Sequence, residues 1–444
     1  MYQIITMKNL KVIFILTIVT TICLGIQSSD AQQLRRKGFL GIRFNPNKLH
    51  PKNGEKGILV QSVPQNSTAS SLGVQPNDVL LTINNQSITN IPSLAKAWKS
   101  LYKNDQVTFE MCRNGKIIKL SGKVIGHPQQ QSTSQTKVIY DQVPFKGGQL
   151  RVIVSHPLKS VRKKHPAIMF IPGYTCSSLD NLPARHPYRQ MFDAWEKAGY
   201  VVYRVEKPGI GDCDGTPDCR SIGFNTEVEA FIAGYKKLKN YDFIDQDNIF
   251  VFGHSMGGVI APLLAEKVQP KGVIVYGTLY STWFEYCLRM FRFQNPNMGV
   301  SFEENEKDMR AYPGFLREYL IEKKSPITLA KNPTYKKLLQ RDHQYRGGEA
   351  IFSRHYSYWQ EVQDAYLTKA WKNTKSYVFS VFGEADFEAL DPTDHRRIVE
   401  IVNHYHPGKA KFAQLDKTNH SFRLVGTMDE WLKRRRNKNF KGLK

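Results

Sequence analysis

Five uninterrupted apolar runs in the second half of the chain restrict its fold more than any other feature. Strands that read as continuous apolar runs are buried on both faces of a sheet, as in parallel sheets covered by helices. Helical stretches separate the runs, so right-handed parallel crossovers are predicted between them. The sequence therefore predicts an α/β fold for residues 137–444. The runs span residues 167–171, 200–205, 248–252, 272–276 and 376–382.

The third apolar run leads directly into Gly253-His-Ser-Met-Gly257, and a helical stretch follows at 259–266. Glycines at this spacing allow a tight turn between a strand and a helix, and such a turn lifts the Ser255 hydroxyl clear of the sheet. The N-terminus of the helix behind the serine favours developing negative charge. Ser255 is therefore the predicted nucleophile.

A serine hydroxyl needs a base that takes its proton, and the base needs a partner that orients it. Asp386 follows the last apolar run, and His420 follows one further predicted strand. Glu384 and Asp391 stand close enough to Asp386 in the sequence to replace it. The order serine, acid, histidine is that of the α/β-hydrolase fold, which residues 137–444 resemble over their whole length.

This resemblance implies an oxyanion hole made of two backbone N–H groups. One would belong to Met256, directly after the serine. The other would belong to Tyr174, in the loop Ile171-Pro-Gly-Tyr-Thr175 that follows an early strand. The chain has Pro-Gly-Tyr here, where many relatives have His-Gly.

Two cysteines lie in or near a glycine-rich loop of the same domain. The stretch 206–215 resembles the Arg-Gly-x-Gly-x-Ser loop of peptidase-like hydrolases, with Cys213 at the serine position. An oxidising compartment would permit a disulfide between Cys213 and Cys219, which would stiffen a loop beside the active site. The alternative is a surface turn with two free cysteines. Only five cysteines follow residue 31, an odd and small number for a chain of this length, so no disulfide framework is expected.

The segment 279–373 is far longer than a connection between two strands requires, and long inserts in compact domains are usually functional. It is rich in aromatic and basic residues and is predicted to form a mostly helical cap over the site. Its aromatic side chains either line a substrate pocket or pack the core of the cap itself. The sequence has no metal-ligand spacing, phosphate loop or dinucleotide fingerprint, so no metal and no cofactor are expected.

Residues 32–126 resemble a small, mostly-β PDZ domain of the type found in exported bacterial proteases. The resemblance rests on residues 71–80, 83–85 and 113–116, and on a loop formed by Gly38, Phe39, Leu40, Gly41 and Ile42. It implies that backbone N–H groups of this loop bind the terminal carboxylate of a peptide, which joins the sheet as an extra strand. A PDZ fold used only for packing is the alternative. The strand-like runs are 39–42, 57–60, 79–83, 107–110 and 117–120.

The polar run 127–136, rich in Gln, Ser and Thr, is predicted to be a linker between the two domains. Residues 1–31 are predicted to be a signal peptide, because Lys8 and Lys11 precede the apolar run 12–26 and small residues follow it. The apolar run is shorter than the ~20 residues that span a bilayer. An uncleaved anchor is the alternative. The expected location is therefore the periplasm or the exterior of the cell.

The chain is strongly basic, with 63 Lys and Arg against 39 Asp and Glu, a net charge of +24. Export, a PDZ domain and a serine triad argue against a nucleic-acid partner. Contact with an anionic envelope surface or steering of acidic substrates fits better, and both would weaken with salt. Solvated surface charge without a partner is the simplest account.

The sequence therefore predicts an exported serine hydrolase that cleaves an ester or related acyl bond through an acyl-enzyme. Its substrate would be a small acyl compound or a peptide, and its PDZ domain would bind a peptide C-terminus. A serine peptidase is the main alternative. A non-enzymatic PDZ binding protein with a degenerate hydrolase domain is a third hypothesis, against which the intact Ser255, Asp386 and His420 argue.

Overall fold

The computed structural model describes residues 34–44, 57–158 and 163–441. The predicted signal peptide at 1–31 lies outside the described residues. The described residues belong to one unit. No helix among the described residues is long and apolar enough to cross a membrane.

In the described part of the N-terminal domain, a five-stranded antiparallel sheet is accompanied by two helices. Its strand order is β1-β2-β4-β5, and β3 pairs with β2. Ile58, Leu80, Phe109 and Met111 lie in its core and are fully buried. The elements are β1 (Ile58–Leu59), α2 (Thr68–Ser71), β2 (Val79–Ile83), β3 (Gln86–Ser87), α3 (Ile91–Lys99), β4 (Gln106–Arg113) and β5 (Lys116–Lys123).

The stretch 39–42, which reads as strand-like, forms no strand. Its backbone is bonded to loops and a helix end instead: the N–H of Phe39 donates to the carbonyl of Ile125, and its carbonyl accepts from Thr68. Gly41 has a φ of +73°, which a regular strand does not permit. The stretch is thus an irregular loop between isolated bridges.

The C-terminal domain is built on an eight-stranded mixed sheet of order β15-β14-β11-β10-β8-β9-β7-β6. The strands from β15 to β9 are parallel, and β7 and β6 are antiparallel. All five apolar runs are strands of its parallel part, which confirms the predicted α/β fold. The strands are β6 (Thr136–Phe145), β7 (Gly148–Pro157), β8 (His165–Ile171), β9 (Val201–Val205), β10 (Ile244–His254), β11 (Gly272–Tyr276), β14 (Tyr377–Ala385) and β15 (Ala410–Asn419).

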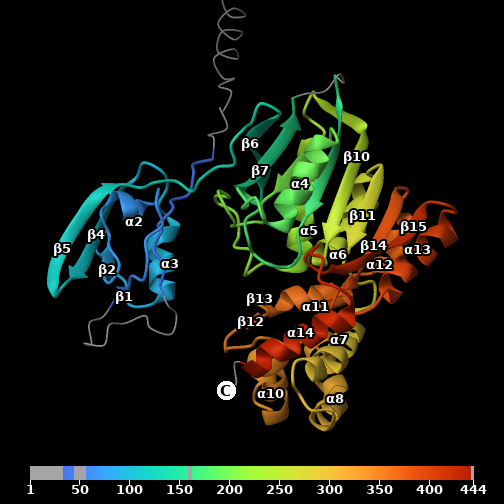
Figure 1. Cartoon of the computed structure of the whole chain (residues 1–444). Coiled ribbons are helices and arrows are strands. Elements are labelled where there is room, and N and C mark those ends of the chain that lie inside the picture. Colours follow the sequence, from blue (N-terminus) through green and yellow to red (C-terminus); the bar gives the residue numbers. More distant parts are fainter. Residues whose placement is uncertain (1–33, 45–56, 159–162, 442–444) are drawn as a thin grey trace, which may run out of the picture. The chain divides into compact units, whose positions relative to one another are not determined.

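Helices cover both faces of this sheet (Figure 1). Alternate residues of β8 belong to different apolar clusters: Met169 packs with α5 and α6, and Phe170 packs with α4. Continuous apolar strands are therefore required, because neither face meets water. The helices on the two faces are α4 (Pro187–Lys197), α5 (Phe224–Leu238), α6 (Met256–Val268) and α13 (Thr393–Tyr405). A further helix, α14 (Met428–Lys441), follows β15.

The segment between β11 and β14 is mostly helical, and most of its helices gather at one end of the sheet (Figure 1). Its last helix packs against α6 and α13 instead. Tyr312 and Tyr319 are fully buried and stack on Phe291 and Phe315 of the same segment, so they pack the segment's own core. Its elements are α7 (Trp283–Asn297), α8 (Phe302–Leu316), the π-helix η1 (Arg317–Ile321), α9 (Pro326–Leu329), α10 (Pro333–Asp342), β12 (Ala350–Ile351), β13 (Arg354–His355), α11 (Tyr356–Asp364) and α12 (Leu367–Asn373).

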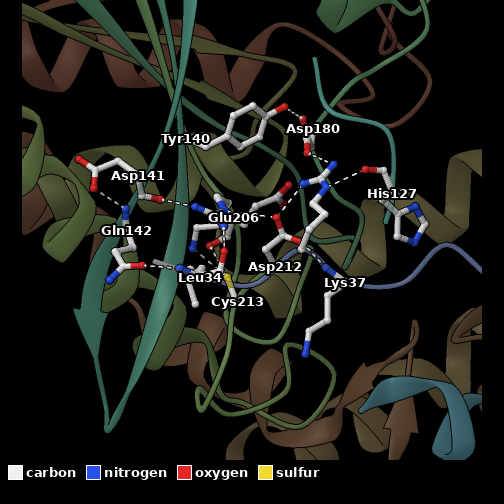
Figure 2. A network of polar contacts seen from close by, with 12 residues as sticks. Leu34, Lys37, His127, Tyr140, Asp141, Gln142, Asp180, Glu206, Asp212 and Cys213 are labelled. Atoms are coloured by element: carbon white, nitrogen blue, oxygen red, sulfur yellow. Dashed lines mark hydrogen bonds and ion pairs between the residues drawn. The ribbon is translucent and has the colours of Figure 1, made fainter. Parts of the chain in front are cut away.

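Segments on either side of the PDZ domain are bound to the hydrolase domain by polar contacts (Figure 2). The Arg36 guanidinium pairs with Asp212 at 2.7 Å and Asp180 at 2.6 Å, and it donates to the carbonyl of His127. Residues 127–135 form no helix or strand, yet Gln130 is buried and accepts a hydrogen bond from Arg204. Part of the polar run is therefore held in place.

Candidate active site

Ser255 lies in a strained turn between β10 and α6. Its backbone has φ 56° and ψ −124°, a region that residues with a side chain rarely adopt. A Cβ atom on Gly257 would lie 2.1 Å from the carbonyl oxygen of Ile171, and one on Gly253 would lie 2.3 Å from that of Gly257. Both positions therefore require glycine, which explains the spacing of the motif.

Asp386 and His420 form a hydrogen-bonded pair. The His420 Nδ1 lies 2.9 Å and 3.0 Å from the two carboxylate oxygens of Asp386, which is fully buried. The N–H groups of Glu388 and Ala389 also donate to Asp386 Oδ1. Burial raises the pKa of Asp386, but the charge and hydrogen bond of His420 and the Ala389 N–H outweigh it, so the pKa is lowered.

The same pair governs the titration of the histidine. Burial lowers the pKa of His420, but the charge and hydrogen bond of Asp386 and the charge of Glu388 oppose it, so the pKa is raised to about 9. The two alternative carboxylates have other partners. Glu384 accepts from the N–H of Lys417, and Asp391 pairs with Arg289 at 2.8 Å.

One pocket brings the sequence-predicted residues of this domain together. Ser255, His420, Tyr174 and Met256 all line it, and the buried Asp386 lies behind His420. Its volume is about 460 Å³. Gly173 lies close to the serine, since a Cβ atom built on it would be 3.2 Å from Ser255 Cβ.

Aromatic and apolar side chains of the insert form much of the pocket wall. Glu388 is the only acidic residue among the described residues that line the pocket, and none of these is Lys or Arg. The predicted steering of acidic substrates thus finds no Lys or Arg among them to hold a carboxylate. The apolar part of the wall includes Trp283, Tyr286, Met290, Phe352, Trp359 and Phe387.

Sequence reasoning missed the part played by His254, the residue before the serine. Its Nε2 lies 2.8 Å from the carbonyl oxygen of His420, and its Nδ1 lies 2.5 Å from the Tyr188 hydroxyl. Burial lowers the pKa of His254 to about 3, so the ring is neutral. Because a carbonyl only accepts, Nε2 carries the proton and Nδ1 accepts from Tyr188. His254 therefore holds the backbone of the His420 loop. The position of His254 directly before Ser255, inside the Gly253–Gly257 motif, is the sequence feature that could have indicated this part.

The predicted disulfide between Cys213 and Cys219 is wrong. Cys219 is bonded to Cys176, and Cys213 is a free, buried thiol. The Cys213 side chain is turned into the core, where it accepts from the N–H of Arg151, and burial raises its pKa to about 12. The observed bond joins the loop after β8 to the loop after β9. Nothing in the sequence spacing connects residues that lie 43 positions apart.

Two family models match this chain, one for each domain. The model described as PDZ domain matches residues 38–124, and the model described as serine aminopeptidase, S33, matches residues 184–381. The chain carries a PDZ domain and an α/β serine hydrolase domain. The second match covers α4 to most of β14, with Ser255 inside it, and ends before Asp386 and His420.

Two curated proteins resemble parts of the chain. The Acyltransferase drtE of Aspergillus calidoustus is 26% identical over 136 residues, which is 31% of this chain and 41% of that protein. The "Probable periplasmic serine endoprotease DegP-like" of Pseudomonas fluorescens is 30% identical over 92 residues, 21% of this chain and 18% of that protein. The matched regions span less than half the length of either relative.

Solved structures resemble the chain at low identity. Est1E from Butyrivibrio proteoclasticus with ferulic acid bound is 14% identical, with a TM-score of 0.42, and covers 68% of this chain and 99% of its own. The acylaminoacyl peptidase of Pyrococcus horikoshii is 13% identical, with a TM-score of 0.42, and covers 76% of this chain and 47% of its own. Identities of this size carry no information about substrate.

Proposed function

We propose that this protein hydrolyses an ester or related acyl bond through an acyl-enzyme on Ser255. One observation carries the proposal: a serine in a strained turn shares a pocket with a histidine whose Nδ1 is bonded to a buried carboxylate. A serine, a base and an orienting acid in this relation are the parts that nucleophilic acyl transfer needs.

The reaction follows from these positions. His420 Nε2 takes the Ser255 proton as the hydroxyl oxygen attacks the carbonyl carbon, and Asp386 holds the protonated imidazole through Nδ1–H. The N–H groups of Met256 and Tyr174 stabilise the oxyanion. The tetrahedral intermediate collapses when His420 gives its proton to the leaving group. Water then attacks the acyl-enzyme by the same steps and releases the acid.

The pocket supports a neutral or cationic substrate with a bulky apolar acyl group. Its wall is largely aromatic, and Glu388 is its only acidic lining residue among those described. A carboxylate in the acyl chain of the substrate would be repelled by Glu388 and would find no Lys or Arg in the lining. A peptide is the second candidate substrate class, favoured by the match to serine aminopeptidases and by the PDZ domain.

The PDZ domain is proposed to bind a peptide C-terminus. The N–H groups of Gly38 and Phe39 are engaged within the domain, with the carbonyls of Leu101 and Ile125. The proposal therefore narrows to the N–H groups of Leu40, Gly41 and Ile42.

Export to the periplasm or the exterior completes the proposal. The signal-like sequence at 1–31, the disulfide between Cys176 and Cys219 and the likeness to a periplasmic protein named DegP-like support it. N-terminal sequencing of the protein recovered from outside the cytoplasm tests it. A chain that stays in the cytoplasm with its first 31 residues intact would contradict it.

A fluorophosphonate probe tests the enzymatic claim, because it reacts only with an activated serine. We expect labelling of the wild-type protein and none of the Ser255→Ala variant. Ser221→Ala is the matched control, since this exposed hydroxyl bonds only to the Asp218 carbonyl among the described contacts. Labelling that survives Ser255→Ala, or no labelling of the wild-type protein, would contradict the claim.

Comparison of nitrophenyl esters with a peptide library separates the two substrate classes. We expect a larger kcat/KM for esters with apolar acyl groups. Peptide turnover that exceeds ester turnover would instead support the peptidase.

A further inference from the structure

Two buried cations bind consecutive carbonyl groups of the loop beside Ser255. The Lys207 ammonium donates to the carbonyl oxygen of Gly173 at 2.6 Å, and Arg354 Nη1 donates to that of Tyr174 at 2.8 Å. Each cation is only 1% exposed. Charged side chains are rarely buried to this degree without a partner.

Glu227 lies between the two cations. Its carboxylate oxygens lie 2.7 Å from Lys207 Nζ and 2.7 Å from Arg354 Nη2, and the residue is fully buried. The three residues come from separate parts of the fold. Lys207 follows β9, Glu227 is on α5, and Arg354 is on β13 of the insert. Burial lowers the pKa of Lys207 to about 8. Below that pH, two positive charges and one negative charge leave an excess of one positive charge, directed at the loop carbonyls.

The Lys207 contact fixes the direction of the Tyr174 N–H group. The carbonyl of Gly173 and the N–H of Tyr174 belong to one planar, trans peptide unit, so they point in opposite directions. A cation held on the carbonyl therefore sets the direction of the N–H. It also polarises the peptide unit and makes the N–H a stronger donor. Arg354 fixes the next peptide unit in the same way.

We propose that Lys207 and Arg354, joined by Glu227, are positioning residues that orient the Tyr174 amide as an oxyanion donor. This inference rests on the proposed acyl transfer at Ser255. Catalysis by an oxyanion hole requires donors that are held in place before the charge develops. The three residues supply that rigidity from behind the loop, without contact with the substrate. The Arg354 contact also ties the insert to the oxyanion loop.

Because the group holds two cations and one carboxylate, either cation can be replaced while Glu227 keeps a partner of opposite charge. Lys207→Met leaves Glu227 paired with Arg354 and removes the anchor of the Gly173 carbonyl. Arg354→Met leaves Glu227 paired with Lys207 and removes the anchor of the Tyr174 carbonyl. Neither change strands a buried charge, which would itself be strongly destabilising.

Arg204→Met is the matched control for loss of a buried cation. Arg204 is also 1% exposed, and its guanidinium bonds to Gln130, Ser155 and the carbonyl of Leu179. None of these contacts is to the carbonyls of Gly173 or Tyr174. Its loss should lower the melting temperature without a selective loss of kcat.

The test combines kinetics on the best nitrophenyl ester with amide hydrogen exchange of peptides that cover residues 172–176. We expect Lys207→Met to fold, to exchange faster over these residues, and to lose about 10- to 100-fold in kcat with KM within about twofold, because removing an oxyanion donor costs about 10²–10³. Arg354→Met should lose less in kcat than Lys207→Met, because Arg354 anchors the peptide unit that follows the one with the Tyr174 N–H. Affinity for a trifluoromethyl ketone should fall with kcat.

Two results would overturn the inference. Unchanged exchange at 172–176 in folded Lys207→Met would show that Lys207 does not hold the loop. Faster exchange with unchanged kcat in Lys207→Met would show that Lys207 holds the loop but that the rigidity of the loop has no effect on turnover. A wild-type protein that turns over no ester and resists fluorophosphonate would instead contradict the proposed function, while the exchange comparison would still report on the loop.

Discussion

At the scale of single residues, His420 is held in its protonated form by its neighbours. Its pKa is raised to about 9 by Asp386 and Glu388 against the opposing effect of burial. A protonated imidazole cannot take the Ser255 proton, so only the neutral fraction is competent. Asp386, with its lowered pKa, stays charged across this range.

We therefore expect kcat/KM to be low near pH 6 and to rise with a midpoint near pH 9. Glu388→Gln removes a negative charge that favours the imidazolium, so its midpoint should lie at lower pH. The pH–rate profiles of the two proteins check this. A wild-type midpoint near the ordinary value of about 6.5, unmoved by Glu388→Gln, would contradict the expected electrostatics.

Glu388 should also select substrates by charge. It lines the pocket, and its carboxylate, that of Asp386 and a ring nitrogen of His420 all lie within 4.8 Å of one another. We expect an ester whose acyl chain ends in a carboxylate to react more slowly than its methyl-capped counterpart. Glu388→Gln should narrow the ratio of the two kcat/KM values by about 3- to 10-fold, because repulsion between like charges falls away.

The ratio of the kcat/KM values of the two esters is the quantity to compare. Any effect of Glu388 on His420 acts equally on both esters and cancels in the ratio. High salt should narrow the wild-type ratio as well. An identical ratio in the two proteins would mean that Glu388 does not meet the acyl chain.

At the scale of elements, the disulfide ties the loop that holds Tyr174 to the loop that carries Lys207. It links Cys176, two residues after Tyr174, to Cys219 across 43 positions. In the chain-entropy account a loop of this length contributes about 4 kcal/mol to the free energy of unfolding. We expect Cys176→Ser and Cys219→Ser to be destabilised by similar amounts in urea titrations.

The double variant Cys176→Ser/Cys219→Ser is the control for these two. It should be about as stable as either single variant, because each single change already breaks the bond. Additive losses would show that the two side chains stabilise the fold separately and that the bond contributes little.

Sequence patterns predicted those elements whose own residue pattern matches the environment that the fold gives them. The apolar runs became β8, β9, β10, β11 and β14 because strands buried on two faces need apolar residues throughout. The serine turn was predictable because Gly253 and Gly257 are required by close backbone contacts. The turn and the order of the acid and histidine also pointed to the residues that line or border the pocket.

Features that depend on tertiary contact were not predictable. The strand-like stretch 39–42 forms an irregular loop because its backbone bonds to Ile125 and Thr68, which lie far along the chain. Cys176 and Cys219 meet only because β8 and β9 are neighbours in the sheet. The group of Lys207, Glu227 and Arg354 joins three separate segments, and no spacing in the sequence marks it.

At the scale of the whole molecule, the net charge of +24 stands apart from the candidate active site, where no Lys or Arg is among the described lining residues. Some of the positive charge is paired with carboxylates of the hydrolase domain, as in the ion pairs of Arg36 with Asp180 and Asp212. Contact of the remaining positive charge with an anionic envelope surface stays a prediction.

The PDZ domain is expected to bring long peptides to the protein. A peptide with a free C-terminal carboxylate should bind more tightly than the same peptide with a C-terminal amide, by about tenfold or more, because backbone N–H groups that bind an anion lose most of their attraction for the neutral amide. Fluorescence anisotropy with the full chain measures both affinities. Equal affinities would contradict carboxylate capture.

The central claim is that Ser255 forms a covalent acyl intermediate. Acid quench of the protein during turnover of a slowly hydrolysed nitrophenyl ester, followed by peptide mass mapping, tests it directly. We predict one acyl group, attached to the peptide that contains Ser255, and none in the Ser255→Ala variant. An acyl group on another residue, or ester turnover that persists in Ser255→Ala, would contradict the account.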